Sequence, residues 1–488
     1  MSVNKWFPGV RQRPAARLQL FCFPFAGGGT TAFRGWQEQL PASIELWPVE
    51  YPGRESRFRE QSFDNCETLA EAICAEVATA IDRPFAFFGH SMGALLAFET
   101  ARRLRRRQGT QPVALFVSGY GAPQLPPFRA PIRNLPELQF RDELRFYGGT
   151  PDEVLANEDL MQILSPLLRR DLGICETYAH SIAPKLECPI IAFSGADDPT
   201  VPWHRLFEWS AQSSAGFLAH IMPGEHFFLR KAAPLICRFI AHHLDQGDTL
   251  RRIIAPTAEE VHLWRVDVEV PEDKVTQLRS VLSPDEVHRA GAYLQPEDRR
   301  RYTVTRAALR RLLGAYANMP PDQIEFSYSP HGKPRCQKLL PVDFNVSHSG
   351  SLALIAITRQ QAVGVDVERV RAGLEVHAIG KQVFTPLELA ELARRAPEQQ
   401  VEAFFDLWVR KESYLKCSGE GFMTSPERVY VGLPPLRGLG LSSNRQRNVT
   451  VSTARVQSFT PAPGYAASLA VEKKWDVITF DDWQFDGI

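Results

Sequence analysis

A serine between two glycines is the first candidate for chemistry in this chain. Ser91 lies in Gly-His-Ser-Met-Gly, residues 89–93, after the apolar run Phe85–Phe88 and before a helical pattern that begins at Met92. A sharp strand-to-helix turn exposes a serine hydroxyl at a sheet edge, and flanking glycines allow the close backbone contacts that the turn needs. The helix start supplies N–H groups and a favourable dipole, so we expect Ser91 to be a nucleophile and Met92 N–H an oxyanion donor.

An acid and a histidine follow in the order Ser, Asp, His, which suits a serine nucleophile on such a turn. Asp198 holds the fourth position of Gly-Ala-Asp-Asp after a strand-like run, and Asp197 is the alternative acid. His226 comes 28 residues after Asp198, behind another strand-like run. We predict that Asp198 orients His226 and that His226 takes the serine proton. His90 precedes the turn and is expected to support its shape.

A glycine-rich loop is expected to complete the oxyanion site. Residues 23–29 read Phe-Pro-Phe-Ala-Gly-Gly-Gly and follow the first strand-like run of the chain. The second oxyanion donor of such sheets comes from a loop of this kind beside the nucleophile. The Ala26 N–H group is therefore our candidate for the second donor.

A second set of residues, in the other half of the chain, suits magnesium chemistry. Asp366 and Glu368 are two residues apart in a strand-like run, so their carboxylates leave the same face. Trp408, Glu412 and Lys416 are spaced by four and share one face of a helix. Together these faces offer three carboxylates and one ammonium group. A hard divalent cation that keeps several waters and binds phosphate oxygens suits this set.

The scaffold for the first set is expected to be an α/β domain. From residue 18 to about 244, apolar runs alternate with helical patterns, which is typical of a parallel sheet with helices on its faces. The expected strands are Leu18–Phe23, Leu46–Glu50, Phe85–Phe88, Val113–Ser118, Ile190–Ser194 and Phe217–Met222. Leu69, Ile73, Val77 and Ile81 predict one buried helix face. A Pro-rich start and helical patterns at about 124–187 predict a lid over the active site.

The second set is expected on a different scaffold. Polar and turn residues predict a linker at 246–258, which separates a domain at 1–245 from one at 259–488. The second half mixes strands with helices and is therefore α+β. Its expected helices are Arg299–Ala317, Pro386–Arg395 and Phe404–Cys417. The spacing of Leu352–Thr358 and Val363–Glu368 predicts a hairpin.

Length and composition exclude some classes of function. The chain has 488 residues, of which 44% are hydrophobic and 23% charged, so it is long enough for two globular cores. The 56 basic and 56 acidic residues cancel, so we expect no binding to nucleic acid or to a membrane surface. No run approaches the ~18 apolar residues of a membrane span. Eight scattered cysteines without a Cys-x-x-Cys pair predict reduced thiols and a cytoplasmic location.

Residues 17–244 resemble the type II thioesterases of the α/β-hydrolase superfamily. The resemblance rests on the glycine-rich loop, on Tyr-Pro-Gly-Arg at 51–54, on Gly-His-Ser-Met-Gly, and on Tyr-Gly-Gly-Thr-Pro at 147–151. It implies a mostly parallel, doubly wound sheet with a helical lid. It also implies removal of acyl groups from the phosphopantetheine arm of carrier proteins in polyketide, non-ribosomal peptide or fatty-acid assembly.

Residues from about 259 to 480 resemble the Sfp-type 4′-phosphopantetheinyl transferases. The matching motifs are Phe-Asn-Val-Ser-His-Ser at 344–349, Gly-Val-Asp-Val-Glu at 364–368 and Trp-Val-Arg-Lys-Glu-Ser-Tyr-Leu-Lys at 408–416. The resemblance implies a two-lobed α+β fold with internal pseudo-symmetry and coenzyme A in the cleft between the lobes. The implied reaction moves the phosphopantetheine arm of coenzyme A to a serine of a carrier protein.

The same resemblance implies roles for individual residues. It makes Asp366, Glu368 and Glu412 the magnesium ligands, with Glu412 also the base toward the carrier serine. The contacts to coenzyme A would come from a larger set of polar side chains: Lys416 on the pyrophosphate, Ser347 and His348 on the 3′-phosphate, Lys333 on another phosphate, and Arg301 and Arg306 in a basic helix near the nucleotide.

Both resemblances concern one chemical object, the phosphopantetheine arm. We therefore expect a bifunctional enzyme that acts on acyl or peptidyl carrier proteins, with coenzyme A as co-substrate and Mg²⁺ as cofactor. Two alternatives stay open. The first half could hydrolyse acyl-CoA or free esters, or one site could be degenerate in a module that docks carriers, although both residue sets are complete.

Overall fold

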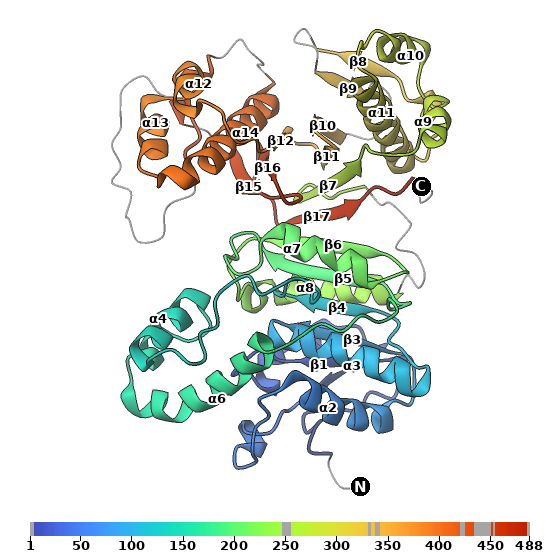
Figure 1. Ribbon diagram of the computed structural model, residues 1–488. Helices are drawn as coiled ribbons and strands as arrows, with labels where there is room; N and C mark the ends of the chain where they lie inside the picture. Colours follow the sequence, from blue (N-terminus) through green and yellow to red (C-terminus); the bar gives the residue numbers. More distant parts are fainter. Residues whose placement is uncertain are drawn as a thin grey trace. The chain divides into compact units, whose positions relative to one another are not determined.

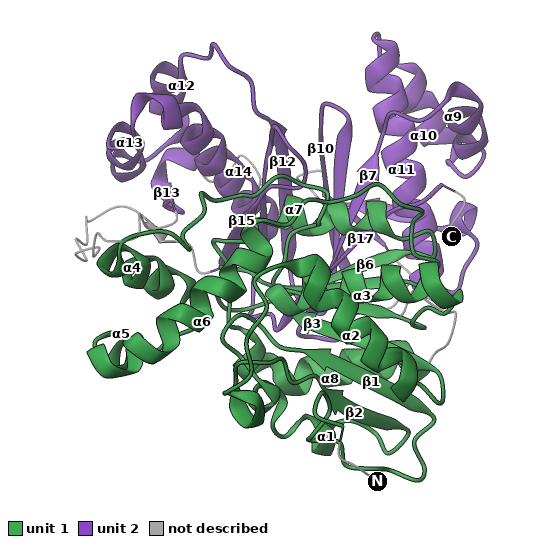
Figure 2. Cartoon of the chain, turned by 60° about the horizontal axis from the view of Figure 1, so that its bottom comes forward, with its two compact units in different colours: residues 1–250 green, residues 251–488 purple. Residues whose placement is uncertain are grey.

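The chain divides into two compact units, residues Met1–Leu250 and Arg251–Ile488 (Figure 2). The computed structural model describes residues 4–245, 255–329, 333–336, 342–419, 425–433, 450–451 and 454–485. Most of the expected linker, residues 246–254, lies outside the described residues. In the described part of the chain, no helix combines the length and the apolar character that crossing a membrane requires.

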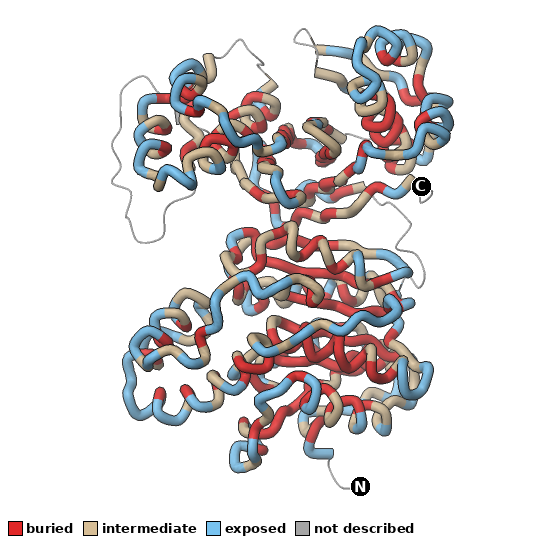
Figure 3. The backbone as a smooth tube through the Cα atoms, viewed as in Figure 1, coloured by how far each residue is buried: buried red, intermediate tan, exposed pale blue. Residues whose placement is uncertain are grey.

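The first unit is built on a six-stranded sheet in which every neighbouring pair is parallel, in the order β2-β1-β3-β4-β5-β6 (Figure 1). The strands are β1 Leu18–Phe23, β2 Ile44–Pro48, β3 Phe85–His90, β4 Leu115–Ser118, β5 Ile190–Gly195 and β6 Phe217–Met222. The central strands are buried along their whole length (Figure 3). Because both faces are covered, they read as continuous apolar runs, and each expected strand overlaps an observed one.

Helices accompany this sheet in the α/β manner that the sequence predicts. They are α1 Trp36–Gln39, α2 Cys66–Ala80, α3 Met92–Gln108, α7 Trp203–Phe207 and α8 Leu229–Asp245, with short 3₁₀ turns η1 Thr30–Phe33, η2 Glu55–Arg57 and η3 Glu208–Gln212. Asn65 caps α2 by accepting hydrogen bonds from the N–H groups of Glu67 and Thr68. Leu69, Ile73 and Val77 are buried on α2, whereas Ile81 follows the helix end and is half-buried.

A helical insertion between β4 and β5 forms the expected lid. It comprises α4 Glu137–Tyr147, α5 Asp152–Leu155 and α6 Glu158–Glu176, which lie together beside the sheet in Figure 1. The insertion has a small apolar cluster of its own, centred on Phe140, Leu144 and Met161. Because it has this separate core, the lid is held together by its own packing.

The described residues of the second unit form two larger sheets and two groups of helices. One sheet has the order β10-β11-β7-β17, and the other has the order β12-β16-β15. Their strands are β7 Glu260–Asp267, β10 Val342–Ser349, β11 Leu352–Arg359, β17 Val477–Asp482, β12 Val363–Arg369, β15 Arg455–Phe459 and β16 Tyr465–Val471. Two short pairs complete the strands, β8 Phe326–Tyr328 with β9 Pro334–Cys336 and β13 Val429–Tyr430 with β14 Thr450–Val451.

The helices of this unit pack into two separate apolar cores, which define two lobes. The first lobe holds α9 Glu272–Arg279, α10 Pro284–Gly291 and α11 Pro296–Ala317, packed with residues of β7, β10 and β11. The second lobe holds α12 Val376–Val383, α13 Pro386–Ala393 and α14 Gln400–Ser418. The 3₁₀ turns are η4 Pro321–Gln323, η5 Pro397–Gln399 and η7 Pro426–Arg428. This two-lobed α+β arrangement agrees with the expected fold.

The expected hairpin between β11 and β12 is wrong. β11 pairs with β10 and β7, whereas β12 pairs with β16 in the other sheet. The physical reason lies on β10, because polar side chains at alternate positions of that strand accept hydrogen bonds from the backbone of β12. The pairs are Asn345 Oδ1 with Val365 N at 2.8 Å, Ser347 Oγ with Val367 N at 3.3 Å, and Ser349 Oγ with Arg369 N at 3.1 Å. Side chains therefore replace a backbone ladder at this edge.

Candidate functional sites

Ser91 lies on a strained turn between β3 and α3. Its φ is 54° and its ψ is −123°, a positive-φ conformation that a non-glycine residue rarely adopts. The Ser91 N–H donates to the Ser118 carbonyl at 2.7 Å. A Cβ atom at Gly89 would overlap the Gly93 carbonyl, and one at Gly93 would overlap the Phe23 carbonyl. Both glycines are therefore required by close backbone contacts, as the motif predicts.

The structure brings Ser91, His226 and Asp198 into one hydrogen-bonded chain. His226 Nε2 lies 3.1 Å from Ser91 Oγ, and His226 Nδ1 lies 2.8 Å from Asp198 Oδ2. Thr200 donates to the other oxygen of Asp198 from its N–H at 2.8 Å and from its hydroxyl at 2.7 Å. Burial raises the pKa of Asp198, but His226 and Thr200 outweigh it, so the carboxyl pKa is below its ordinary value. Asp197 is exposed.

His90 lies next to His226 but takes no part in the hydrogen bonds that link Ser91, His226 and Asp198. Its Nδ1 lies 2.8 Å from Ser118 Oγ, and its ring packs edge-on against Phe227 and Phe228. Burial, helped by the nearby His226, lowers the pKa of His90 to about 3. The ring is therefore neutral and supports the turn, in agreement with the expectation.

The two expected oxyanion donors lie on adjacent segments. Met92 is the first residue of α3, and the N–H at that position has no acceptor within its own helix. Ala26 follows β1 in the glycine-rich loop. The Phe23 carbonyl at the start of this loop lies against Gly93, in the turn that carries Ser91. The loop and the helix start are thus neighbours, which is the arrangement that two converging donors need.

The end of lid helix α4 reaches the same place. The ring of Tyr147 lies 6.0 Å from that of His226, edge to face. Gly149 is in contact with the Phe227 ring so closely that a Cβ atom would overlap it. Arg230 donates to the Gly149 carbonyl at 3.0 Å. The lid therefore forms one wall of the serine site.

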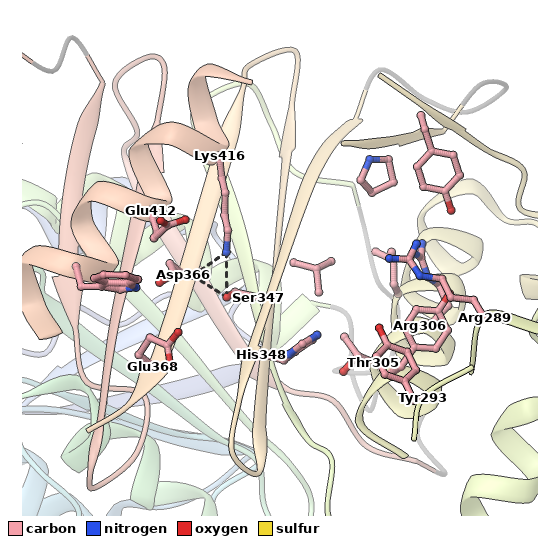
Figure 4. A pocket seen from close by; sticks show the side chains of 16 residues that line it. Arg289, Tyr293, Thr305, Arg306, Ser347, His348, Asp366, Glu368, Glu412 and Lys416 are labelled. Atoms are coloured by element: carbon pink, nitrogen blue, oxygen red, sulfur yellow. Dashed lines mark hydrogen bonds and ion pairs between the residues drawn. The ribbon is translucent and has the colours of Figure 1, made fainter. Parts of the chain in front are cut away.

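The second site lies where α14 packs on β12 (Figure 4). Asp366 and Glu368 come from the strand, and Glu412 and Lys416 come from the helix. A Cβ atom at Gly364 would overlap the Ser413 carbonyl of α14. The glycine of Gly-Val-Asp-Val-Glu thus permits the close approach that brings the two pairs together, as the spacing predicts.

Serines of β10 bind the strand carboxylates. Ser347 donates to Asp366 Oδ1 at 2.8 Å, and Ser349 donates to Glu368 Oε2 at 2.7 Å. Lys416 Nζ lies 2.6 Å from Asp366 Oδ1 and 3.1 Å from Ser347 Oγ. Sequence reasoning missed Ser349 and placed Ser347 on a phosphate. The pattern that could have revealed this role is a polar residue at every second position of β10, the strand that lies beside the two carboxylates of β12.

Negative charge at this site is only partly balanced. Asp366 Oδ2 is buried and has no hydrogen-bond partner within the described residues. Burial raises the pKa of Glu412, and the neighbouring Asp366 and Glu368 raise it further. Burial likewise raises the pKa of Glu368, against the hydrogen bond from Ser349. A cation would relieve this repulsion, and hard oxygen donors suit Mg²⁺.

The described carboxylate, histidine and cysteine side chains nowhere form a group of three in an arrangement that could enclose a metal ion. Asp366 is instead paired with Lys416. Because Mg²⁺ is usually held by one or two carboxylates together with substrate phosphates and waters, a closed protein cage is not required. The donor set therefore fits this ion in the presence of a phosphate ligand.

A cavity of about 540 Å³ connects these carboxylates to the first lobe. Figure 4 shows Asp366, Glu368, Glu412 and Lys416 on one side, Arg289, Tyr293, Thr305 and Arg306 on the other, and His348 between them. The Arg306 Nη1 atom is buried and has no hydrogen-bond partner within the described residues. The cavity therefore offers carboxylates at one end and guanidinium groups at the other.

Two expected phosphate contacts do not reach the cavity. Lys333 Nζ donates to the carbonyls of Val363 at 3.2 Å and Lys416 at 2.8 Å. Arg301 donates to the Gly350 carbonyl at 3.0 Å and pairs with Asp298 at 2.7 Å. Both side chains are engaged by protein oxygens and lie outside the cavity lining. Arg289, which belongs to none of the recognised motifs, lies in the lining instead.

Comparison with known protein families matches both halves of the chain. Residues 18–244 match the thioesterase domain family. Residues 270–360 match the N-terminal domain of 4′-phosphopantetheinyl transferases, and residues 362–470 match the 4′-phosphopantetheinyl transferase superfamily.

Individual relatives repeat this division. The gramicidin S biosynthesis protein GrsT of Aneurinibacillus migulanus is 41% identical over 254 residues, which cover 52% of this chain and 97% of that protein. Thioesterase PikA5 of Streptomyces venezuelae is 37% identical over 254 residues, 51% of this chain and 90% of that protein. The 4′-phosphopantetheinyl transferase HetI of Nostoc sp. is 38% identical over 182 residues, 36% of this chain and 76% of that protein. The chain therefore belongs to the thioesterase family in its first half and to the 4′-phosphopantetheinyl transferase superfamily in its second.

Proposed function

We propose that this chain both primes carrier proteins and clears their arms. The second unit would transfer 4′-phosphopantetheine from coenzyme A to a carrier serine with the help of Mg²⁺. The first unit would hydrolyse acyl thioesters on that arm. The observation that carries the proposal is the presence, in one chain, of the Ser91–His226–Asp198 hydrogen bonds and of a cavity with carboxylates at one end and guanidinium groups at the other.

In hydrolysis, Ser91 Oγ attacks the thioester carbonyl while His226 Nε2 takes its proton. Asp198 holds the Nδ1–H tautomer of His226 and stabilises the imidazolium that forms. The N–H groups of Ala26 and Met92 bind the developing oxyanion. His226 then protonates the leaving thiolate of the arm, and water releases the acyl group from Ser91 by the same steps.

In transfer, Asp366, Glu368 and Glu412 would offer carboxylate oxygens to Mg²⁺, and phosphate oxygens of coenzyme A and waters would complete its coordination. The ion would offset charge on the pyrophosphate of coenzyme A. Lys416 binds the same pyrophosphate, and Glu412 takes the proton of the carrier serine. The serine oxygen forms a bond to the β-phosphorus while the bond to the bridging oxygen breaks, so 3′,5′-ADP leaves. His348 and Arg306 bind phosphate at the nucleotide end, with Arg289 beside them, and Ser347 and Ser349 position the carboxylates.

Carrier proteins or domains of polyketide, non-ribosomal peptide or fatty-acid assembly are the proposed partners. GrsT, a relative of the first half, is a gramicidin S biosynthesis protein, and HetI is a 4′-phosphopantetheinyl transferase. One proposed activity attaches the phosphopantetheine arm to a carrier, and the other hydrolyses thioesters on that arm. Carrier proteins would therefore be substrates of both units.

Mass spectrometry of an apo carrier incubated with coenzyme A and Mg²⁺ tests the transfer. We expect the mass increase of one phosphopantetheine group, and its persistence after chelation of the metal would contradict the magnesium role. Hydrolysis of acetyl carrier by wild type and by Ser91→Ala tests the other half. Faster hydrolysis of free acetyl-CoA than of acetyl carrier would favour the alternative substrate class.

A further inference from the structure

A buried ion pair in the first unit joins the lid to the body of the domain. Arg54 precedes η2, and Asp171 lies on lid helix α6. The pair is bidentate, with Arg54 Nη1 and Nη2 each 2.9 Å from one oxygen of Asp171. The side chains are 5% and 0% exposed. Because burial of two charges costs about as much as their attraction returns, stability alone does not explain such a pair.

The Asp171 carboxylate also binds the backbone of the glycine-rich loop. Its Oδ2 atom accepts from the Gly27 N–H at 2.7 Å, and Arg54 Nη1 donates to the Gly28 carbonyl at 3.0 Å. Gly27 directly follows Ala26, the candidate oxyanion donor. Its φ is 73°, and a Cβ atom there would collide with Leu168, which lies on α6 one turn before Asp171. Helix α6 therefore packs directly on this loop.

Glu55 holds the other end of the same loop. Its carboxylate accepts from the N–H groups of Thr30 at 2.8 Å and Thr31 at 3.1 Å, and from both hydroxyls. A Cβ atom at Gly29 would overlap the Glu55 carboxylate. Two consecutive residues, Arg54 and Glu55, thus bind this segment on the two sides of Gly29. Asp171 of the lid adds a further hydrogen bond to the loop, at Gly27.

We propose that Asp171 and Arg54 are positioning residues for hydrolysis at Ser91, through which the lid helix sets the oxyanion loop. The hydrogen bond from Gly27 to Asp171 fixes the peptide plane next to the Ala26 N–H. An oxyanion donor acts only when it is held at hydrogen-bond distance from the developing charge, and loss of one donor costs roughly 10²–10³ in kcat. Docking of α6 is therefore part of the assembly of the site. This inference rests on the proposed hydrolysis at Ser91.

Two variants separate positioning from stability. Asp171→Asn keeps the shape but leaves Arg54 short of a charge partner, so it also destabilises the fold. The double variant Arg54→Met with Asp171→Leu removes both charges, a change that buried pairs often tolerate. With S-acetyl-N-acetylcysteamine as substrate, we expect both variants to lose about 100-fold in kcat, with KM within about threefold. Phosphonylation of Ser91 by a fluorophosphonate, whose phosphoryl oxygen takes the oxyanion position, slows by a similar factor.

Glu99→Gln is the matched control. Glu99 is another mostly buried carboxylate, which pairs with Arg102 and Arg103 on its own helix α3 and accepts a hydrogen bond from the Tyr178 hydroxyl. We expect it to lower the unfolding temperature and leave kcat within about threefold of wild type. Phosphopantetheine transfer to an apo carrier, measured on every variant, reports the integrity of the second unit.

The outcomes are distinct. A double variant that folds and keeps wild-type kcat overturns the inference. The inference is also overturned if Glu99→Gln loses kcat in proportion to its fall in unfolding temperature, because the loss of kcat would then follow stability and not the position of the loop. Ser91→Ala separates this from the proposed function itself. If that variant still hydrolyses the substrate, the assignment of the serine site fails, whatever the result at Asp171.

Discussion

Asp198 and Asp197 are adjacent acids in very different surroundings. Asp198 is buried and bound to His226 and Thr200, whereas Asp197 is exposed. We predict that Asp198→Asn lowers kcat for acetyl-carrier hydrolysis by about 10⁴-fold, because the amide favours the wrong tautomer of His226. Asp197→Asn should stay within about threefold of wild type. Steady-state kinetics of both variants measure this ranking, and the reverse ranking would transfer the role to Asp197.

His90 makes the first unit sensitive to acid. Its pKa is about 3 in the fold and near 6.5 in an unfolded chain, so below pH 6.5 the unfolded state binds the extra proton. Stability is then complete above about pH 6.5 and falls as the pH drops toward 3. The loss at pH 5 is about 2 kcal/mol for this one group.

His90→Asn should remove that part of the acid sensitivity. The asparagine keeps a polar atom near Ser118 and does not titrate. Thermal unfolding of wild type and variant between pH 7 and pH 5 measures the effect. The gap between their unfolding temperatures should narrow as the pH falls, and a constant gap would contradict the prediction.

At the scale of elements, β10 holds the carboxylates of β12 through its serines. We predict that Ser349→Ala raises the Mg²⁺ concentration needed for half-maximal transfer by about tenfold, because partners of metal-binding side chains commonly contribute 10–100-fold to affinity. Ser351→Ala is the control, since the Ser351 hydroxyl lies 3.0 Å from the Tyr465 hydroxyl and binds no carboxylate. Equal magnesium requirements in all three proteins would show that Glu368 needs no support.

The contact between α14 and β12 depends on Gly364. We predict that Gly364→Ala pushes the helix from the strand and lowers transfer by at least 10²-fold, while hydrolysis by the first unit is retained. Gly291→Ala is the matched change, because nothing lies within 4 Å of a Cβ atom at that position. Transfer and hydrolysis assays on both variants decide the matter, and near-normal transfer in Gly364→Ala would show that the contact can relax.

Sequence reasoning succeeded where one element determined the answer. The strands of the first unit were recognisable because both faces of their sheet are buried. Gly89 and Gly93 were recognisable because their spacing follows from the single turn that carries Ser91. It failed where distant segments meet. Asp171 binds Arg54, which lies 117 residues away, and no local pattern links them. The spacing of β11 and β12 suggested a hairpin, but their partners are decided by side chains of β10.

Two phosphate contacts show the same limit at the site. Lys333 and Arg301 match the expected composition of a phosphate site, yet backbone carbonyls and Asp298 take up their donors. A basic residue in a sequence motif does not reveal which acceptor its side chain will meet. Arg289 reaches the cavity from α10 without any motif around it.

At the scale of the whole molecule, the fusion suggests that one activity corrects the other. A transferase that accepts acetyl-CoA would place a blocked arm on a carrier, and a thioesterase in the same chain would free it. Tethering can raise the local concentration of the second site to the millimolar range. We predict that acetyl-CoA with an apo carrier yields holo carrier with wild type and acetyl carrier with Ser91→Ala.

Intact-mass spectrometry over time follows both products. Coenzyme A in place of acetyl-CoA is the control, because both proteins should then give holo carrier at equal rates. Accumulation of acetyl carrier at the same rate with wild type and Ser91→Ala would exclude correction and leave shared expression as the reason for the fusion.

The hydrogen bonds between side chains of β10 and the backbone of β12 also concern association between copies of this molecule. An open strand edge is a template on which a second chain can add a strand, and such addition leads to aggregation. In β12 the amide groups that would serve as that template are already bound by Asn345, Ser347 and Ser349. Side chains of β10, two of which also bind the carboxylates of the second site, thus occupy the amide groups of β12 with which a strand of another copy would otherwise pair.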